Sequence, residues 1–230
     1  MALFLGKRVR LLHDSGSDPS QNLAREDELF ALVESSEHSE TVRFWTNSEC
    51  LVRGKAKNAR YGWYREGLAE ALGVRVFQRE TGGGVVYHDI GNLNWSIFAR
   101  SEGAFHSPAK LFGEASRYMI EGLGRLGIKA EFSVPNKIDV EGRKVSGLAA
   151  RSTSRAVLVH GTLLLHSDLE KLNRLCIPPV GCPPVANLSQ WAEGIRAHAV
   201  VAAFGEAMKA SGLEVLLQDD PVPGRQRLTN

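Results

Sequence analysis

The 230-residue sequence is poor in the features that mark several classes of protein. Its three cysteines, Cys50, Cys176 and Cys182, are an odd number that implies no disulfide framework. Cys176 and Cys182 lack the short paired spacing and the neighbouring histidines of a zinc site. No apolar run approaches the roughly 20 residues of a membrane-spanning helix, and the first residues lack the apolar core and cleavage site of a secretory signal. We therefore predict a protein of a reducing cytoplasm with no membrane segment.

Charge and composition exclude further classes. The net charge of +2 is too small to indicate binding to nucleic acid or to an anionic membrane. Hydrophobic residues at 43% and charged residues at 23% are ordinary for a globular enzyme. The length favours one domain, which we place over residues 1–230, with a loose polar tail over residues 218–230.

Local patterns predict alternating helices and strands. The predicted helices cover residues 22–35, 64–72, 107–126, 169–175 and 194–211. The predicted strands cover residues 41–45, 50–53, 74–77, 85–87, 93–98, 129–132, 137–140, 143–145 and 157–165. Strands joined through hairpins, with helices placed irregularly between them, predict an α+β fold with a mixed, largely antiparallel sheet and flanking helices. The period-2 pattern over residues 93–98 is broken only by Phe98.

The most informative segment contains the consecutive glycines Gly82, Gly83 and Gly84 between two strands. Without Cβ atoms a ligand can approach the backbone closely, and the N–H groups can point at an anion. The nearby Arg79 adds a planar cation suited to phosphate or carboxylate. The segment is neither a Walker loop nor a dinucleotide fingerprint. Taken alone, it is equally typical of a tight hairpin or a bulge.

Two more segments carry candidate polar residues. Lys144 follows a predicted hairpin turn and precedes the small pair Ser146 and Gly147, although a single lysine is usually a solvated surface charge. His160 enters an apolar strand, where a histidine is more often structural than catalytic.

Taken in order, the three segments resemble the signatures of the lipoate–protein ligase family. They are Arg79-Glu80-Thr81-Gly82-Gly83-Gly84-Val85-Val86-Tyr87-His88-Asp89-Ile90-Gly91-Asn92, then Gly142-Arg143-Lys144-Val145-Ser146-Gly147, then His160-Gly161-Thr162-Leu163-Leu164-Leu165 with Asp168. The resemblance implies the catalytic fold shared by lipoate– and biotin–protein ligases. It also implies a two-step reaction, in which ATP activates lipoate as lipoyl-adenylate and a lysine of a lipoyl carrier domain then receives the lipoyl group.

The resemblance also implies roles for residues. Lys144 would be catalytic, placed between the lipoate carboxylate and the α-phosphate. The residues implied to bind substrate or nucleotide are Arg79, Gly82, Gly83, Gly84, Val85, Val86, Tyr87, His88, Asn92, Asn136, Ser146, Gly147 and His160. Mg²⁺ would accompany ATP, held mostly by phosphates and water. Lys137 stands where the family commonly has an aspartate, which leaves Asp139 as the candidate metal-facing carboxylate.

Other functions stay open. Ligases of this family carry a C-terminal accessory domain, so a separate subunit supplies it here or the chain performs part of the reaction. Related octanoyl- or lipoyl-transferases use a cysteine nucleophile instead of ATP, and Cys176 and Cys182 lie near its expected position without its Cys-Gly context. A non-catalytic relative that binds lipoate or a carrier is a third possibility, which Lys144 and Arg79 disfavour. The choice between lipoate and octanoate, set by an apolar tunnel, is not readable from the sequence.

Overall fold

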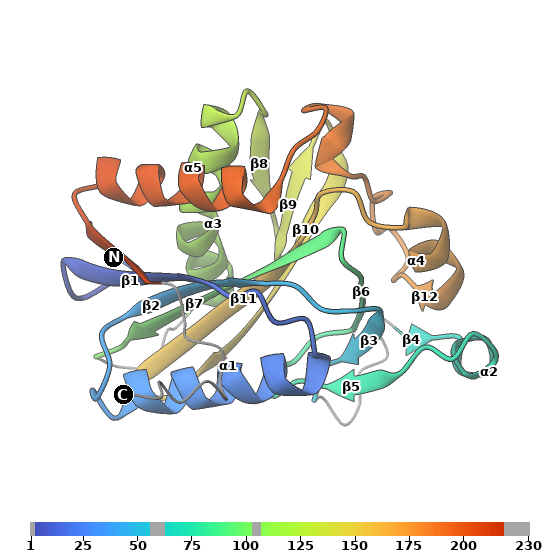
Figure 1. Cartoon of the computed structure of the whole chain (residues 1–230), viewed down its shortest axis with the longest axis horizontal. Coiled ribbons are helices and arrows are strands. Elements are labelled where there is room, and N and C mark those ends of the chain that lie inside the picture. The colour runs from blue at the N-terminus through green and yellow to red at the C-terminus, as the bar shows by residue number, and fades with distance from the viewer. Residues whose placement is uncertain (1–2, 56–62, 103–106, 219–230) are drawn as a thin grey trace, which may run out of the picture.

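The centre of the molecule is a mixed, largely antiparallel eight-stranded sheet, seen in a computed structural model that describes residues 3–55, 63–102 and 107–218 (Figure 1). In spatial order its strands are β13 (Glu214–Gln218), β1 (Arg8–His13), β2 (Thr41–Trp45), β7 (Asn92–Arg100), β11 (Ala156–Leu164), β10 (Arg143–Ser152), β9 (Lys137–Val140) and β8 (Ala130–Ser133). β1 runs parallel to β13 and β2, and the other neighbouring pairs are antiparallel. The predicted fold class is confirmed.

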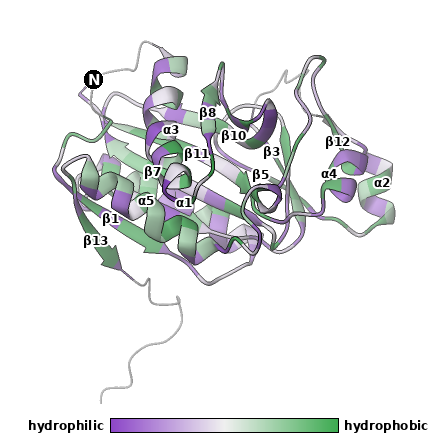
Figure 2. Cartoon of the chain, turned by 90° about the horizontal axis from the view of Figure 1, so that it is seen from above, coloured by the Kyte–Doolittle hydropathy of each residue, from purple (hydrophilic) through white to green (hydrophobic). Residues whose placement is uncertain are grey.

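Two small sheets and five helices complete the described part of the chain. The three-stranded sheet has β5 (Val76–Gln78), β3 (Cys50–Arg53) and β6 (Val85–His88) in that order, and the two-stranded sheet pairs β12 (Cys176–Ile177) with β4 (Trp63–Tyr64). The helices are α1 (Pro19–Glu34), α2 (Glu66–Ala71), α3 (Pro108–Arg125), α4 (Leu169–Leu175) and α5 (Ala197–Ala210), with a short 3₁₀ turn at Leu188–Gln190. Figure 2 shows β13 at one edge of the molecule and α2, α4 and β12 at the opposite end.

Helices cover both faces of the large sheet. α1 lies against one face, and α3 and α5 lie against the other (Figure 1). On β7, Ile97 belongs to the core that contains Met119 and Phe204 of these two helices, whereas Phe98 packs with Phe30 of α1. A strand buried on both faces has no polar side to present to solvent. For this reason Phe98 breaks the alternation predicted for its segment.

Helix starts follow capping chemistry. The side chain of Asp18 accepts a hydrogen bond from the Gln21 backbone N–H at 2.9 Å, so α1 begins at Pro19, three residues before the predicted start. Ser107 and Asp168 cap α3 and α4 in the same way. No helix in the described residues is both long and apolar enough to cross a bilayer.

Several predicted boundaries were wrong, and four strands were missed. The helix predicted over residues 64–72 is shorter, because Tyr64 pairs with Cys176 between two strands. The strand predicted over 143–145 continues to Ser152, since pairing with β11 extends it. The missed strands are β1, β4, β12 and β13. The predicted tail begins at Gln218, which is the last residue of β13, and its other residues, 219–230, lie outside the described part of the chain.

Candidate active site

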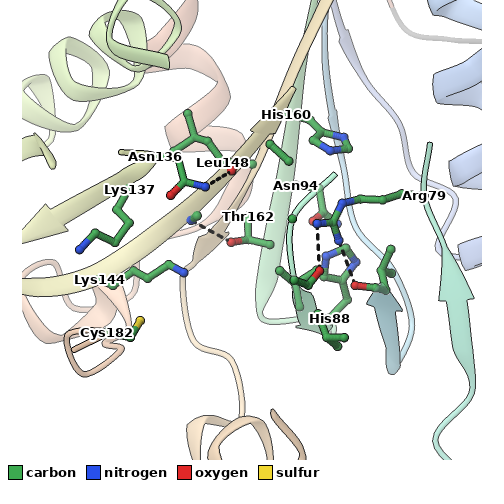
Figure 3. Close-up of a pocket in the computed structure, with 18 of the residues that line it drawn as sticks. Arg79, His88, Asn94, Asn136, Lys137, Lys144, Leu148, His160, Thr162 and Cys182 are labelled. Atoms are coloured by element: carbon green, nitrogen blue, oxygen red, sulfur yellow. Dashed lines mark hydrogen bonds between the residues drawn. The ribbon is translucent and has the colours of Figure 1, made fainter. Parts of the chain in front are cut away.

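One cavity joins the glycine segment to Lys144. It has a volume of about 470 Å³ and is walled by α1, the segment from Arg79 to Val86, β10, β11 and the loops around Asn136 and Cys182. Gly83 and Gly84 line it, and so do Lys144 and Gly147. In Figure 3, Lys137, Lys144 and Cys182 lie at one side of the pocket, and Arg79 and His88 lie at the other. The structure thus brings the three sequence signatures to one place.

The Arg79 guanidinium holds the glycine loop in shape. Its Nη2 donates to the carbonyl oxygens of Gly82 at 2.7 Å and Gly84 at 3.0 Å, and its Nη1 donates to that of Val52 at 3.0 Å. Burial lowers the pKa of Arg79 to about 10, although the Glu26 carboxylate partly offsets this effect. Arg79 therefore orients the loop through carbonyl groups, whereas the sequence suggested a cation presented to an anion.

Gly54, which was not among the predicted site residues, packs directly against this loop. Its N–H donates to the Gly84 carbonyl at 3.2 Å. A methyl group at position 54 would lie 2.8 Å from the carbonyl carbon of Gly82 and would also collide with the carbonyl oxygen of Gly83. Only a residue without a Cβ allows the two backbones to approach this closely. A single glycine after a strand carries no sequence signal for such a contact.

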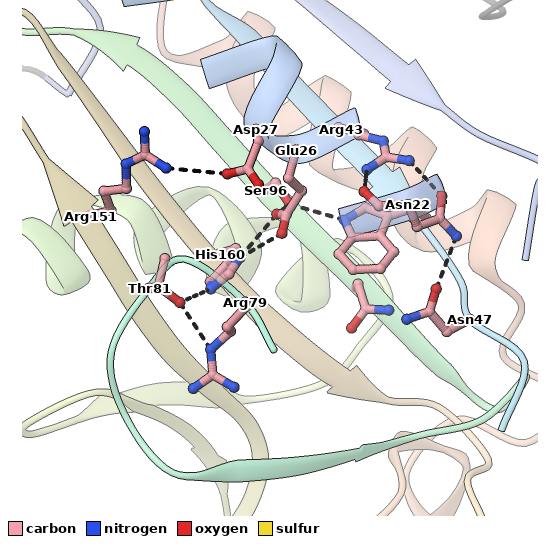
Figure 4. A network of polar contacts seen from close by, with 12 residues as sticks. Asn22, Glu26, Asp27, Arg43, Asn47, Arg79, Thr81, Ser96, Arg151 and His160 are labelled. Atoms are coloured by element: carbon pink, nitrogen blue, oxygen red, sulfur yellow. Dashed lines mark hydrogen bonds and ion pairs between the residues drawn. The ribbon is translucent and has the colours of Figure 1, made fainter. Parts of the chain in front are cut away.

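A buried polar chain links α1 to the glycine loop (Figure 4). His160 Nδ1 lies 2.9 Å from Glu26 Oε1, and His160 Nε2 lies 2.7 Å from Thr81 Oγ1. The Thr81 hydroxyl also accepts a hydrogen bond from Arg79 Nε at 2.9 Å. Burial opposes the ionisation of Glu26, but the charge and hydrogen bond of His160 and the Ser96 hydroxyl outweigh it and lower the pKa. Both His160 nitrogens have protein partners, so His160 supports the loop.

Glu26 was not among the predicted site residues, because it is one of three consecutive acidic residues in a predicted helix. The residue is 3% exposed, although glutamate is rarely buried without a partner. The partners come from β7 and β11, which lie far from α1 in the sequence. No local pattern distinguishes Glu26 from its solvated neighbours Asp27 and Glu28.

His88 is a neutral group in the cavity wall. It is 4% exposed, and its Nδ1 lies 3.1 Å from Asn47 Nδ2. Burial lowers the pKa of His88 to about 3, and the nearby Arg79 cation acts in the same direction. The imidazole therefore stays uncharged at neutral pH.

Lys144 is held on β10 with its amine above Gly147. Its backbone N–H donates to the Pro184 carbonyl at 2.9 Å, and a methyl group at position 147 would lie 2.8 Å from Lys144 Nζ. Burial lowers the pKa of Lys144, the Cys182 thiol opposes this shift, and the Lys137 cation adds to it. Lys144 is thus a partly desolvated cation that a negatively charged ligand would stabilise.

A second cavity of about 110 Å³ lies beyond Lys144, which lines both. Tyr87, Ser146, Cys176 and Cys182 line this second cavity. The Tyr87 hydroxyl donates to Glu49 Oε1 at 2.7 Å, so it is engaged within the protein. Burial raises the pKa of Cys176 to about 11, although Lys144 opposes the shift. The Cys176 thiol is therefore protonated at neutral pH.

Four of the predicted residues either lie outside both cavities or have a side chain that is bonded within the protein. Asn136 lines the larger cavity while its Nδ2 donates to the Leu148 carbonyl at 2.6 Å. Gly82, Asn92 and Asp139 line neither cavity. Within the described ranges, no group of three or more His, Cys, Asp or Glu side chains is placed to hold a metal ion. The buried Asp139 carboxylate alone does not make a resident metal site.

Comparison with known proteins decides the family. The model of the lipoyl protein ligase A/B catalytic domain matches residues 18–209. The chain belongs to this family. A curated relative in it, the lipoate-protein ligase A of Psychrobacter cryohalolentis, is 32% identical over 217 residues, which is 86% of this chain and 60% of that protein. The chain spans about half the length of the curated relatives it matches. It covers 44% of the probable lipoate-protein ligase A of Mycoplasma pneumoniae and 45% of a lipoate-protein ligase of Bacillus subtilis.

Solved structures of the family share the fold. The bipartite lipoate protein ligase of Thermoplasma acidophilum, described with its E2 lipoyl domain, has a TM-score of 0.77 at 21% identity and covers 94% of this chain and 87% of its own. A lipoate-protein ligase A bound with ATP has a TM-score of 0.77 at 23% identity and covers 96% of this chain and 90% of its own. These likenesses confirm the fold that the sequence signatures implied.

Proposed function

We propose that this chain is the catalytic domain of a lipoate–protein ligase, formed as one domain over residues 1–230. The main observation in support is that the glycine loop and Lys144 line the same cavity. Membership of the family and the names of its curated relatives support the proposal. The cysteines of the described chain are free, in keeping with a cytoplasmic location.

In the first step a carboxylate oxygen of lipoate attacks the α-phosphorus of ATP. The new C–O–P linkage forms as the bond from the α-phosphorus to the bridging oxygen breaks, and pyrophosphate leaves with that electron pair. Two anions must meet, so a fixed cation at the meeting point lowers the barrier. Lys144 is that cation, and the adjacent backbone of Val85 and Val86 lines the same space. Charge on the ligand in turn stabilises the ammonium form that burial disfavours.

In the second step the neutral amine of a carrier lysine attacks the carbonyl carbon of lipoyl-adenylate. The amide C–N bond forms, the C–O bond to AMP breaks, and the amine loses a proton. The acceptor we propose is a lipoyl carrier domain. We also propose a separate accessory subunit, because the Thermoplasma ligase, which shares this fold, is described as bipartite.

Mg²⁺ would enter as the ATP complex, with phosphates and water as its ligands. The donor set of the described chain does not fit a resident metal, so no step is assigned to Mg²⁺.

The test is pyrophosphate release from ATP and lipoate, with lipoyl-adenylate identified by mass spectrometry. Replacing Lys144 by Met should lower the rate by roughly 10² to 10³-fold, the usual effect of removing a group that stabilises developing charge. Lys129→Met, at an exposed position, is the matched control. A second measurement follows lipoyl transfer to a carrier domain with and without the accessory subunit. Undiminished adenylation in Lys144→Met would overturn the proposed role.

A cysteine-dependent acyl transferase is the second candidate, because Cys182 lines both cavities beside Lys144. The Cys182 thiolate would attack the carbonyl of an acyl thioester and release the donor thiol, and a carrier lysine would then displace the cysteine. Transfer from an octanoyl thioester without ATP, abolished in Cys182→Ser and retained in Cys176→Ser, would favour this reaction. ATP-dependent adenylation retained in Cys182→Ser would exclude it. Lipoate binding with neither activity would indicate a binding protein.

A further inference from the structure

Two ammonium groups share one wall of the large cavity. Lys137 on β9 and Lys144 on β10 both line it, and Figure 3 shows them on the same side of the pocket. Within the described residues neither ammonium group has a hydrogen bond or an ion pair. Glu26 is the only acidic residue among the described residues that line the cavity, and His160 and Ser96 engage its carboxylate. This wall therefore presents two cations to the cavity and no free carboxylate.

The register of β9 and β10 places the two ammonium groups near each other. Lys137 pairs with Gly147 across the two strands, and Lys144 pairs with Asp139. The Lys144 amine lies above Gly147, where an added methyl group would be 2.8 Å from Nζ. Side chains at opposed positions of neighbouring strands interact. Because Gly147 has no side chain, the Lys144 amine occupies the place of the cross-strand neighbour of Lys137.

The two like charges disfavour each other in the empty cavity. Burial lowers the pKa of Lys144, and the Lys137 cation lowers it further. A ligand with several negative charges would stabilise both ammonium groups. A single carboxylate or phosphate has oxygens for one of them, whereas a triphosphate has oxygens for both.

The donor set at this wall does not suit a metal ion held by the protein. Mg²⁺ is usually held by one or two carboxylates together with substrate phosphates. Asp139, the candidate metal-facing carboxylate, is two residues from Lys137 on β9 but lines neither cavity. An ammonium group repels Mg²⁺ and binds phosphate oxygens directly, as a point charge with three donors. The wall therefore fits phosphate groups.

We infer that Lys137 binds the β- and γ-phosphates of ATP while Lys144 binds the α-phosphate. The inference rests on the proposed function, which places the α-phosphorus at Lys144. The charge that develops on the leaving pyrophosphate is then stabilised by a fixed ammonium group of this chain. Mg²⁺ would neutralise part of the phosphate charge that attracts Lys137. The protein should therefore bind a triphosphate at least as tightly without Mg²⁺ as with it.

The test compares the binding of a triphosphate and a monophosphate by calorimetry, in EDTA and in Mg²⁺. The probes are AMP and an ATP analogue with a methylene group between the α- and β-phosphates, which cannot release pyrophosphate. In EDTA, wild-type protein should bind the analogue more tightly than AMP, and Mg²⁺ should not increase its affinity. Lys137→Met should reduce the ratio of the two affinities roughly tenfold or more, the effect of losing a hydrogen bond between charged groups. The affinity for AMP, which lacks the β- and γ-phosphates, should not change.

Two further variants separate charge from structure. Lys137→Arg keeps a cation and should retain most of the ratio. Lys137→Asp should reverse the effect of the metal, because a carboxylate repels free phosphate but can share Mg²⁺ with it, so Mg²⁺ should now increase the affinity for the analogue. Lys129→Met removes a lysine at an exposed position that lines neither cavity and should leave the ratio unchanged. Melting temperatures show that each variant is folded.

An unchanged ratio in Lys137→Met, or wild-type binding of the analogue that requires Mg²⁺, would overturn the inference. The proposed function would survive either result if wild-type protein still released pyrophosphate from ATP and lipoate. Binding of the analogue in neither condition, together with no pyrophosphate release, would overturn the proposed function as well.

Discussion

Gly54 provides a sharp test of how the glycine loop is held. An alanine methyl at this position would lie 2.8 Å and 2.9 Å from the carbonyl carbon and oxygen of Gly82, and closer still to the Gly83 carbonyl. All these atoms belong to the backbone, so the collision cannot be relieved by the rotation of a side chain. Relief requires the two segments to separate by several tenths of an ångström or more. Overpacking of this kind costs about 1–3 kcal/mol of stability.

The displaced loop would also move the backbone of Val85 and Val86 away from Lys144. A shift approaching 1 Å costs roughly 10²-fold in rate when groups must meet in one geometry. Gly54→Ala should therefore lose about that much kcat/KM in the pyrophosphate assay, with a lower melting temperature. Gly67→Ala is the matched control, because a methyl there meets nothing within 4 Å. If Gly54→Ala were as active and as stable as Gly67→Ala, the close approach of the two backbones would not govern the site.

Three further predictions concern buried ionisable groups. Lys144→Met should not lower the melting temperature, because burial lowers the pKa of Lys144 and disfavours its ammonium form; a large drop measured by calorimetry would contradict this. The pKa of Glu26 in the folded chain lies below its ordinary value of 4.5, so its contribution to stability is complete at neutral pH and is lost as the pH falls through the folded pKa. Glu26→Gln should accordingly show a smaller loss of stability than wild type as the pH falls below 4.5 in urea titrations, and an equal loss would count against the Glu26–His160 pair. The pKa of His88 is about 3 in the folded chain and 6.5 in the unfolded chain, so the imidazole is protonated first in the unfolded chain. His88 therefore lowers the free energy of unfolding as the pH falls from 6.5 towards 3. The imidazole ¹⁵N signals of the folded protein should stay those of a neutral ring at pH 5, and titration near pH 6.5 would refute the burial argument.

Local patterns predicted most of the antiparallel part of the fold. The strands Thr41–Trp45, Cys50–Arg53 and Lys137–Val140 and the helix Leu169–Leu175 have their predicted bounds. Hairpin turns and capping residues act within a few positions, so the sequence carries their signals directly. β1 pairs in parallel with the edge strand β13, joining Arg8 to Glu214 across 206 positions, and no local signal reports such a pairing.

The candidate site divides in a similar way. Lys144, Gly83, Gly84 and His88 were predicted from the signatures and do line the cavity. Glu26 and Gly54 were not predicted, because their importance lies in contacts with Thr81, His160 and the loop backbone made only in the folded chain.

The sequence by itself determined the family and the place of the ammonium group, because glycine runs and a lysine after a hairpin are properties of consecutive residues. Only the tertiary structure decided what each polar group can still offer a ligand. Arg79 and His160 form hydrogen bonds with the glycine loop and with Glu26, whereas Lys144 lines the cavity. A hydrogen bond depends on atoms brought within about 3 Å by packing, and the residues that share these bonds are far apart along the chain.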